Sequence, residues 1–174
     1  MTLLTGLEFD ALFDSYTHDA WRLEVRDSYL GVAYEPEPFR RFMAGETDDG
    51  VWLHDWTDGV RRRAAEGKNM ARVRVVTVPL SDYARFSLDV CQRHNIPAGE
   101  DIRYLPRHAA GDLPDHDFWL FDSSRLYVIH FDDTNDMIGA EPVDDPAEIA
   151  RHIAWRDLAW SRALKPAQFA ATTL

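Results

Sequence analysis

Residues 71–80 have the sequence ARVRVVTVPL, a run of β-branched residues that is broken by a proline. Val and Thr favour the extended backbone of a strand, whereas proline cannot donate a hydrogen bond to a neighbouring strand. We therefore expect a central strand that begins near Ala71 and ends close to Pro79. The pattern on either side decides what kind of fold contains this strand.

The segment that follows has a helical pattern. Apolar residues recur every three or four positions over residues 81–95, and Ser81 stands where a helix N-cap hydroxyl is preferred. Cys91 falls on the apolar stripe, so we expect it in the core rather than at a reactive site. Farther along, short apolar runs alternate with turn residues, and a long amphipathic segment begins at Asp144 or Asp145. We expect strands over residues 101–105, 117–122, 125–131 and 137–143, and a helix over residues 144–164.

Upstream of the central strand, one strand is flanked by helical segments. Trp21, Leu23 and Val25 alternate with charged residues, and this period of two predicts a strand with one buried and one charged face. Apolar spacing, prolines at helix starts and glycines at helix ends predict the neighbouring helices. These helices are expected over residues 9–16, 35–46 and 48–69.

The expected order from Arg72 onward is a strand, a helix, four strands and a helix. This order predicts an α/β fold in which a mixed sheet is flanked by helices, with a helical part added at the N-terminus. The best boundary, at residues 67–69, separates an N-terminal part (residues 1–67) from an α/β part (residues 68–174). With 45% hydrophobic residues, we expect both parts to form one compact unit. Only the small, polar ending AATTL is expected to fray.

Charge and composition exclude several classes of protein. The formal net charge is −11, from 19 basic and 30 acidic residues, so the surface disfavours direct binding of nucleic acid. No apolar run is long enough for a transmembrane helix, and the N-terminus lacks the basic region of a secretory signal. The single cysteine excludes an internal disulfide and a cysteine-rich zinc site. We expect a cytoplasmic protein.

The densest group of acids, at the end of the fourth expected strand of the α/β part, is a candidate metal site. His130, Asp132, Asp133 and Asp136 offer nitrogen and oxygen ligands. A calcium loop that starts at Asp132 fails, however, because glycine and acids are missing at its required positions. Asp, Asn and Thr are also typical of a surface turn, which we expect here.

Motifs of catalysis and of nucleotide binding are absent from the sequence. It contains no G-x-S-x-G nucleophile turn, no glycine-rich phosphate loop and no H-E-x-x-H pair. We therefore assign no catalytic residue, no metal ligand and no cofactor.

Charged side chains within the expected strands suggest a polar site. Buried charges must be paired, so such residues are able to form an ion network in a cleft for a small ligand. The alternative is a solvated sheet face with cross-strand ion pairs. The candidate pocket residues are Arg22, Glu24, Arg74, Glu100 and Arg103.

Aromatic residues suggest a second kind of site. The chain contains six Trp, nine Phe and six Tyr, more than a small core requires. Aromatic side chains are enriched at protein interfaces. The candidate interface residues are Trp52, Trp56, Trp155 and Trp160.

Several motifs in order along the chain resemble an actinobacterial family of unknown function. They are RLEVRDSY, VRVVTVPLSDYARF, GEDIRYLPR and DFWLFD, together with EPFRRFMAGE and the late segment RDLAWSRA. The resemblance implies genes that often lie beside helix-turn-helix regulators and small companion proteins. It implies no chemistry.

The α/β part also resembles one half of a phospholipase D-like domain, in which an H-x-K-x-x-x-x-D strand carries the active site. If Asp122 takes the last position of that motif, Asp115 stands at the His position and Asp117 at the Lys position. The nucleophile and the phosphate-binding cation are then both replaced by acids, which repel phosphate. This resemblance therefore implies an inactive domain.

We expect a non-catalytic regulatory or accessory protein that binds another protein, such as a helix-turn-helix regulator or a small companion protein. Its acidic surface would mask the partner's basic DNA-binding face, as antitoxin-like proteins do. A homodimer is compatible with the sequence. The alternative is a small-molecule sensor or enzyme that uses the polar Arg/Glu pocket.

Overall fold

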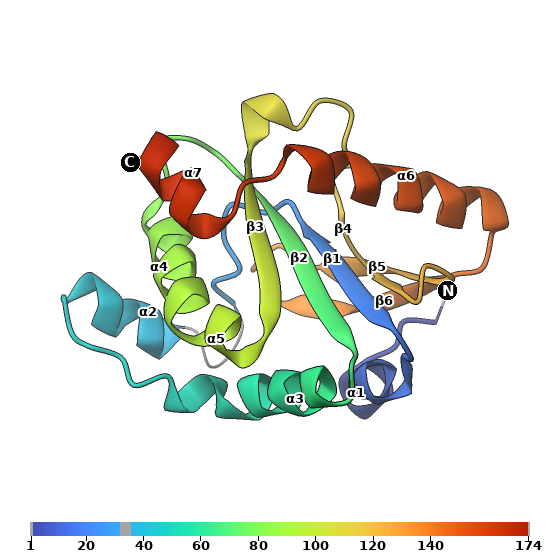
Figure 1. The fold of residues 1–174 in the computed structure, drawn as a ribbon, viewed down its shortest axis with the longest axis horizontal. Helices are drawn as coiled ribbons and strands as arrows, with labels where there is room; N and C mark the ends of the chain where they lie inside the picture. The colour runs from blue at the N-terminus through green and yellow to red at the C-terminus, as the bar shows by residue number, and fades with distance from the viewer. Residues whose placement is uncertain (1, 32–35, 174) are drawn as a thin grey trace.

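The computed structural model describes residues 2–31 and 36–173 of the chain. Within this part, a six-stranded sheet with the strand order β3-β2-β1-β4-β5-β6 is flanked by helices (Figure 1). The strands are β1 (Asp19–Glu24), β2 (Asn69–Val76), β3 (Glu100–Pro106), β4 (Asp117–Phe121), β5 (Arg125–Phe131) and β6 (Met137–Val143). β1, β2 and β3 are parallel, whereas β4, β5 and β6 continue the sheet with antiparallel pairing. The predicted mixed α/β sheet with flanking helices is confirmed.

The helices also lie close to their predicted places. They are α1 (Gly6–Ser15), α2 (Pro36–Met43), α3 (His54–Ala65), α4 (Asp82–Val90), α5 (Ile96–Ala98), α6 (Pro146–Arg162) and α7 (Pro166–Thr173), with the short turns η1 (Val51–Leu53), η2 (Cys91–Asn95) and η3 (Arg107–Ala109). The predicted caps are confirmed, because the Ser81 side chain accepts from Ala84 N at 3.1 Å and that of Asp145 from Ala147 N at 2.8 Å. Glu35, at the start of one predicted helix, lies outside the described residues.

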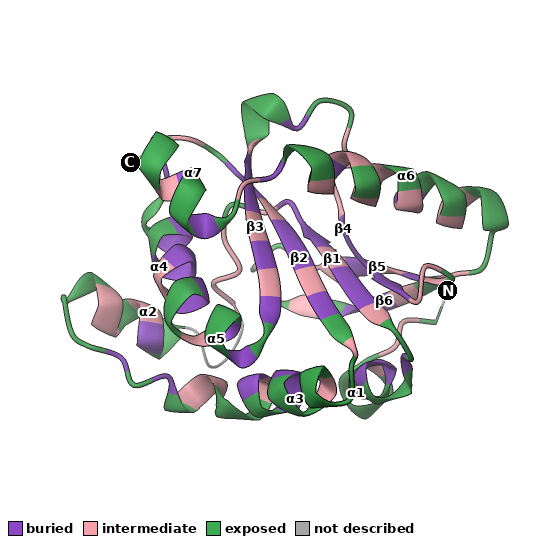
Figure 2. Ribbon diagram, in the orientation of Figure 1, coloured by how far each residue is buried: buried purple, intermediate pink, exposed green. Residues whose placement is uncertain are grey.

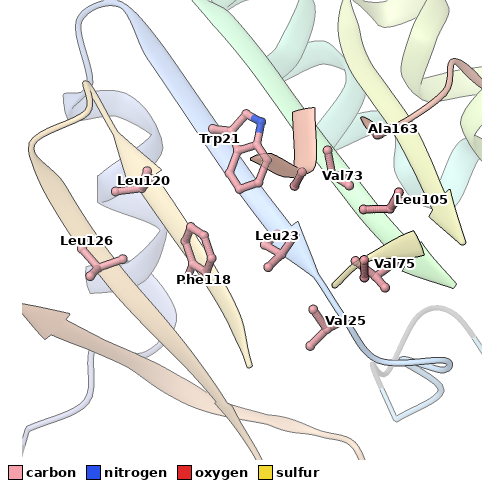
Figure 3. Packing of buried hydrophobic residues seen from close by; sticks show 12 residues of the cluster. Trp21, Leu23, Val25, Val73, Val75, Leu105, Phe118, Leu120, Leu126 and Ala163 are labelled. Atoms are coloured by element: carbon pink, nitrogen blue, oxygen red, sulfur yellow. The ribbon is translucent and has the colours of Figure 1, made fainter. Parts of the chain in front are cut away.

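One face of the sheet, which we call the outer face, is covered by α6. Trp21, Leu23 and Val73 point to this side and pack with Phe118 and Ala159 in one buried cluster (Figure 3). Burial on this face follows the period of two of the strands, since the charged neighbours of these residues point to the other side. The buried centre of the outer face is therefore a hydrophobic layer.

The opposite face, the inner face, is covered by α1, α3 and the α4–η2–α5 segment. Phe13 of α1 and Val60 of α3 pack against Trp119 and Phe121, while Cys91 packs against Ile102 at the other side of the sheet. The predicted burial of Cys91 is confirmed. Buried residues recur along the central strands (Figure 2). The sheet is thus enclosed between two layers of helices.

The N-terminal part of the chain supplies the centre of the sheet. β1 lies between β2 and β4, and pairs in register over Asp19–Glu24 with Asn69–Arg74. The expected boundary at residues 67–69 therefore separates two parts of the chain that share one sheet.

The prediction that the ending frays is wrong for residues 170–173. These residues continue α7, and Phe169 just before them is fully buried against Tyr104, with ring centroids 5.3 Å apart. The composition of the ending alone gives no sign of this anchor. Leu174 lies outside the described residues.

A pair of histidines joins α6 to the segment that leads into β4. His116 Nε2 lies 3.0 Å from His152 Nε2, and His152 Nδ1 lies 2.8 Å from the Glu148 carbonyl oxygen. Burial lowers the pKa of His152. The His152 ring also packs edge to face on Phe118, with ring centroids 4.7 Å apart.

The turn between β4 and β5 is locked to the start of β1 by Asp122. Asp122 and Ser123 both have positive φ, 53° and 51°, as the central residues of a type I′ hairpin turn do. The Asp122 carboxylate accepts hydrogen bonds from the backbone N–H groups of Thr17 at 3.0 Å, His18 at 2.7 Å and Asp19 at 3.2 Å. Burial raises the pKa of Asp122, but these hydrogen bonds lower it by a larger amount. The pKa therefore lies below its ordinary value.

Replacing Asp122 by alanine is expected to lower the free energy of unfolding by about 2 kcal/mol, because three backbone donors lose a charged acceptor. Since the folded-state pKa is depressed, this contribution is present at neutral pH and is lost as the pH falls through that pKa. Urea unfolding at pH 7 measures the difference. Asp133→Ala, in an exposed turn, is the control; equal effects of the two substitutions would contradict this role of Asp122.

Candidate functional site

Charged side chains gather at the centre of the inner face. We call the set Arg22, Glu24, Arg72, Arg74, Glu100 and Asp117 the ion network. The parallel register of β1 and β2 places Arg22 opposite Arg72 and Glu24 opposite Arg74. Because side chains alternate along each strand, these residues point away from α6 and toward α1 and α3.

Glu24 is the centre of the ion network. Its Oε1 accepts from Arg72 NH1 at 2.9 Å and lies 3.3 Å from Arg22 NH1. Its Oε2 accepts from Arg74 Nε. Burial raises the pKa of Glu24, but Arg74, Arg72 and Arg22 together lower it far below its ordinary value. Glu24 is therefore a buried, ionised carboxylate held by three guanidinium groups.

Asp117 holds the side of the network next to β4. Its carboxylate accepts from Arg22 NH2 at 3.1 Å, from Val25 N at 2.9 Å and from the Tyr29 hydroxyl at 2.7 Å. Burial raises the pKa of Asp117 above its ordinary value in spite of Arg22. Asp117 is thus one of the side chains that tie the loop after β1 to the sheet.

Glu100 closes the other side of the network, at β3. It accepts from Arg72 Nε at 2.5 Å, from Asn95 Nδ2 at 3.0 Å and from Trp56 Nε1 at 3.1 Å. These contacts connect η2 and α3 to the sheet. Asp117 and Glu100 thus each hold a different segment that lies over the inner face, whereas Glu24 is held by arginines of the sheet itself.

The burial of the network bears on the alternative of a solvated sheet face. Glu24, Arg72, Glu100 and Asp117 are all buried. The expected solvation is therefore wrong for these residues, although the expected cross-strand ion pairs are present, and the binding of a ligand here stays a prediction.

A cavity of about 540 Å³ lies over the network, and we call it the inner cavity. Its floor includes Arg22, Glu24, Arg72 and Arg74, and its walls are largely aromatic. The volume falls within the roughly 300–1,000 Å³ of small-molecule sites. The aromatic residues that line it are Phe9, Phe13, Tyr29, Trp52, Trp56, Tyr83, Trp119 and Phe131.

Four of the five predicted pocket residues meet in the ion network, and Arg103 does not. Arg22, Glu24 and Arg74 line the inner cavity, and Glu100 lies behind it. Arg103 is on the outer face, where its guanidinium carbon lies 3.5 Å from the centroid of the Trp160 ring. β3 alternates like β1, so Glu100 and Arg103 point to opposite faces.

The four tryptophans of the predicted interface lie in two places, the inner cavity and α6, and each is partly buried. Trp52 stacks on Phe86 with ring centroids 6.2 Å apart, and Trp56 lines the inner cavity. Trp155 packs against His152, with ring centroids 4.7 Å apart, and Trp160 lies under Arg103. Their part in an interface stays a prediction.

Sequence reasoning missed Tyr29, Asn95 and Trp56 as partners of the network. Asp117 was noted only as the residue in place of a catalytic lysine. One feature of the sequence points to its role in the network, namely its position at the start of the apolar strand DFWLF. An acid that begins a fully buried strand requires a buried partner.

The acidic segment after β5 forms the predicted surface turn. Asp132 Oδ1 accepts from Thr134 N at 2.8 Å and from Asp136 N at 3.0 Å. His130 Nε2 pairs with Glu141 of β6 at 2.8 Å. Within residues 2–31 and 36–173, no group of three or more His, Cys, Asp or Glu side chains is placed to hold a metal ion.

The three acids of the phospholipase D-like alignment have different environments. Asp115 is exposed ahead of β4, Asp117 is buried in the ion network, and Asp122 binds the backbone at the start of β1. The last two are occupied by structural contacts.

Removing the charge of Glu24 is expected to destabilise the fold strongly. Glu24→Gln should lower the free energy of unfolding by roughly 3–5 kcal/mol, because three arginines of the network lose their shared, buried counterion. The matched control is Glu37→Gln, which breaks an exposed ion pair with Arg40 and should have a much smaller effect. Urea unfolding of both variants measures the difference. A loss for Glu24→Gln as small as that of the control would show that the network adds nothing to stability.

Comparison with known proteins identifies the chain at the level of a family. Within the described part of the chain, no helix combines the length and the apolarity required to cross a membrane. A search of curated proteins finds no match. A family model described as Domain of unknown function (DUF6879) matches residues 7–171, a range that contains every strand of the sheet and the whole ion network. The chain therefore belongs to the family Domain of unknown function (DUF6879).

Proposed function

We propose that the protein binds a small organic molecule in the inner cavity and acts as a non-catalytic regulatory or accessory protein. The observation that carries this proposal is the combination of a cavity of about 540 Å³, aromatic walls and a buried charged floor. Small-molecule sites are typically apolar clefts in which a few fixed polar groups orient the ligand. The ion network supplies such groups on strands rather than on loops.

The contacts of the network favour binding over catalysis. Glu24 is shared by three arginines, and Asp117 and Glu100 each accept from three donors. A general base needs an accessible carboxylate within reach of a substrate proton. Carboxylates that are fully engaged by neighbours serve better to hold the guanidinium groups in place.

A thermal-shift screen of nucleotides, amino acids, organic acids and amines tests this proposal. A ligand present at 100 times its Kd adds about 2.7 kcal/mol of stability, which raises the melting temperature measurably. We expect at least one class to stabilise the protein, and we expect Leu53→Trp, at the cavity wall, to abolish the shift by filling the cavity. Leu7→Trp, at a position that is 86% exposed and outside the cavity, is the control. A flat screen, or equal shifts in both variants, would contradict a ligand in this cavity.

A protein partner is the second candidate, favoured by the net charge of −11 and by the exposed Leu7 on α1. The partner that we propose is a basic protein such as a helix-turn-helix regulator, whose DNA-binding face the acidic surface would cover.

Affinity purification from the native host, with mass spectrometry, tests for this partner. We expect one basic protein to co-purify at low salt and to be lost when exposed acids such as Asp10 and Asp14 of α1 are changed to lysine. The control variant is Asp112→Lys, which reverses an exposed acid away from α1. Absence of any partner at all salt concentrations would contradict the interaction.

A further inference from the structure

The ion network does not present its two signs of charge equally to the inner cavity. It contains three guanidinium groups and three carboxylates. The side chains of Asp117 and Glu100 are 0% exposed, and that of Glu24 is 4% exposed, whereas Arg22 and Arg74 each keep 18%. Glu24 is also the only carboxylate of the network among the residues that line the cavity. A molecule that enters therefore meets guanidinium groups in front of their counterions.

Arg22 is the centre of this positive floor. Its guanidinium carbon lies 5.5 Å from the centroid of the Tyr29 ring and 5.7 Å from that of Trp119. Its terminal nitrogens pair with Glu24 and Asp117, but its buried Nε has no hydrogen-bond partner among the described residues. A buried donor without an acceptor costs free energy, so the guanidinium group of Arg22 is not fully satisfied by its protein partners.

The walls next to Arg22 select the shape of the ligand. The ring of Phe13 lies 5.4 Å from that of Trp56 and 5.0 Å from that of Trp119, both edge to face. Aromatic faces and edges set at these angles favour a flat ring that stacks on one face and meets the edge of another. The cavity thus combines donors at its floor with a slot for a planar group.

We propose that the ligand of the inner cavity is a planar aromatic acid, whose anionic group faces Arg22 and whose ring lies against Trp119 and Trp56. This inference rests on the proposed function, because it names the class of molecule bound at the same site. A guanidinium group binds carboxylate or phosphate through charge-assisted hydrogen bonds, which are stronger than bonds to a neutral acceptor.

The acidic surface does not decide this selectivity. Asp10, Asp14 and Asp55 at the rim are exposed, and Asp14 is paired with Arg62 and Arg63. Exposed charges are screened over a Debye length of about 8 Å at physiological salt, whereas buried groups are screened much less. The floor, rather than the rim, sets the sign of charge that the site prefers.

Three probes with one ring system and different charge test the inference: 2-naphthoate, 2-naphthamide and 2-naphthylmethylamine at pH 7.5. Calorimetry measures the affinities, and quenching of tryptophan fluorescence reports occupancy, since Trp52, Trp56 and Trp119 line the cavity. We expect the acid to bind about tenfold or more tightly than the amide, and the amine to bind most weakly. An amide or amine that equals the acid, or no binding of any probe, would overturn the proposed class.

Two variants test whether Arg22, at the floor of the cavity, causes the preference for the acid over the amide. Arg22→Lys keeps the charge but loses the planar fork, and should reduce the acid-to-amide ratio to about threefold or less. Arg62→Gln, at the exposed rim, should leave the ratio unchanged. If Arg22→Lys does not fold, the ranking of the probes on the unaltered protein decides the matter. Loss of the preference in Arg62→Gln alone would overturn the assignment to Arg22.

The outcomes separate this inference from the function on which it rests. A ligand of another class found in the thermal-shift screen, together with no preference for naphthoate, refutes the acid but leaves a small-molecule site. A flat screen together with no probe binding refutes both.

Discussion

The constraint on which the inner side of the molecule depends is the burial of Glu24 among three arginines. A carboxylate in the interior must be paired, and the partners of Glu24 come from β1 itself and from the neighbouring β2. Sliding β1 by one residue against β2 would exchange the inner and outer faces and leave these charges under α6. The ion network therefore fixes the register of the parallel strands more firmly than the hydrophobic contacts of Leu23 and Val73 alone.

The same charges position the layer above the sheet. Glu100 accepts from Trp56 of α3 and from Asn95 of η2, and Asp117 accepts from Tyr29 in the loop after β1. Segments far apart in sequence thus share the polar contacts of one sheet face. The inner cavity is the space that remains where these segments meet over Arg22. The ion network thus determines both the shape of the cavity, by holding the segments around it, and the charge of its floor. This connection explains why a polar floor and aromatic walls occur together.

Much of the fold was predictable because each local pattern agreed with its environment. The β-branched run of β2, the alternation of β1 and the caps Ser81 and Asp145 all indicate their elements from neighbouring residues alone. The site was predictable only in part, because alternation shows that Arg22 and Glu24 share a face but does not show what covers that face. That cover comes from α1 and α3. Arg103 lies on the opposite face because it is three residues after Glu100 in β3, where side chains alternate between the faces. Asp117 acquires its role only through the antiparallel pairing of β4 with β1.

The central position of β1 has a consequence for how the chain reaches its fold. β1 precedes the other strands in the chain, yet Asp19 pairs with Asn69 on one side and Trp21 with Leu120 on the other. Contacts between such distant residues are slow to form, because the loop between them must close before they stabilise anything. Until β4 is made, β1 has an open edge and an uncovered Trp21, which is the state in which a nascent chain pairs with the wrong strand. The strand at the centre of the finished sheet thus depends on partners that lie far from it in the sequence.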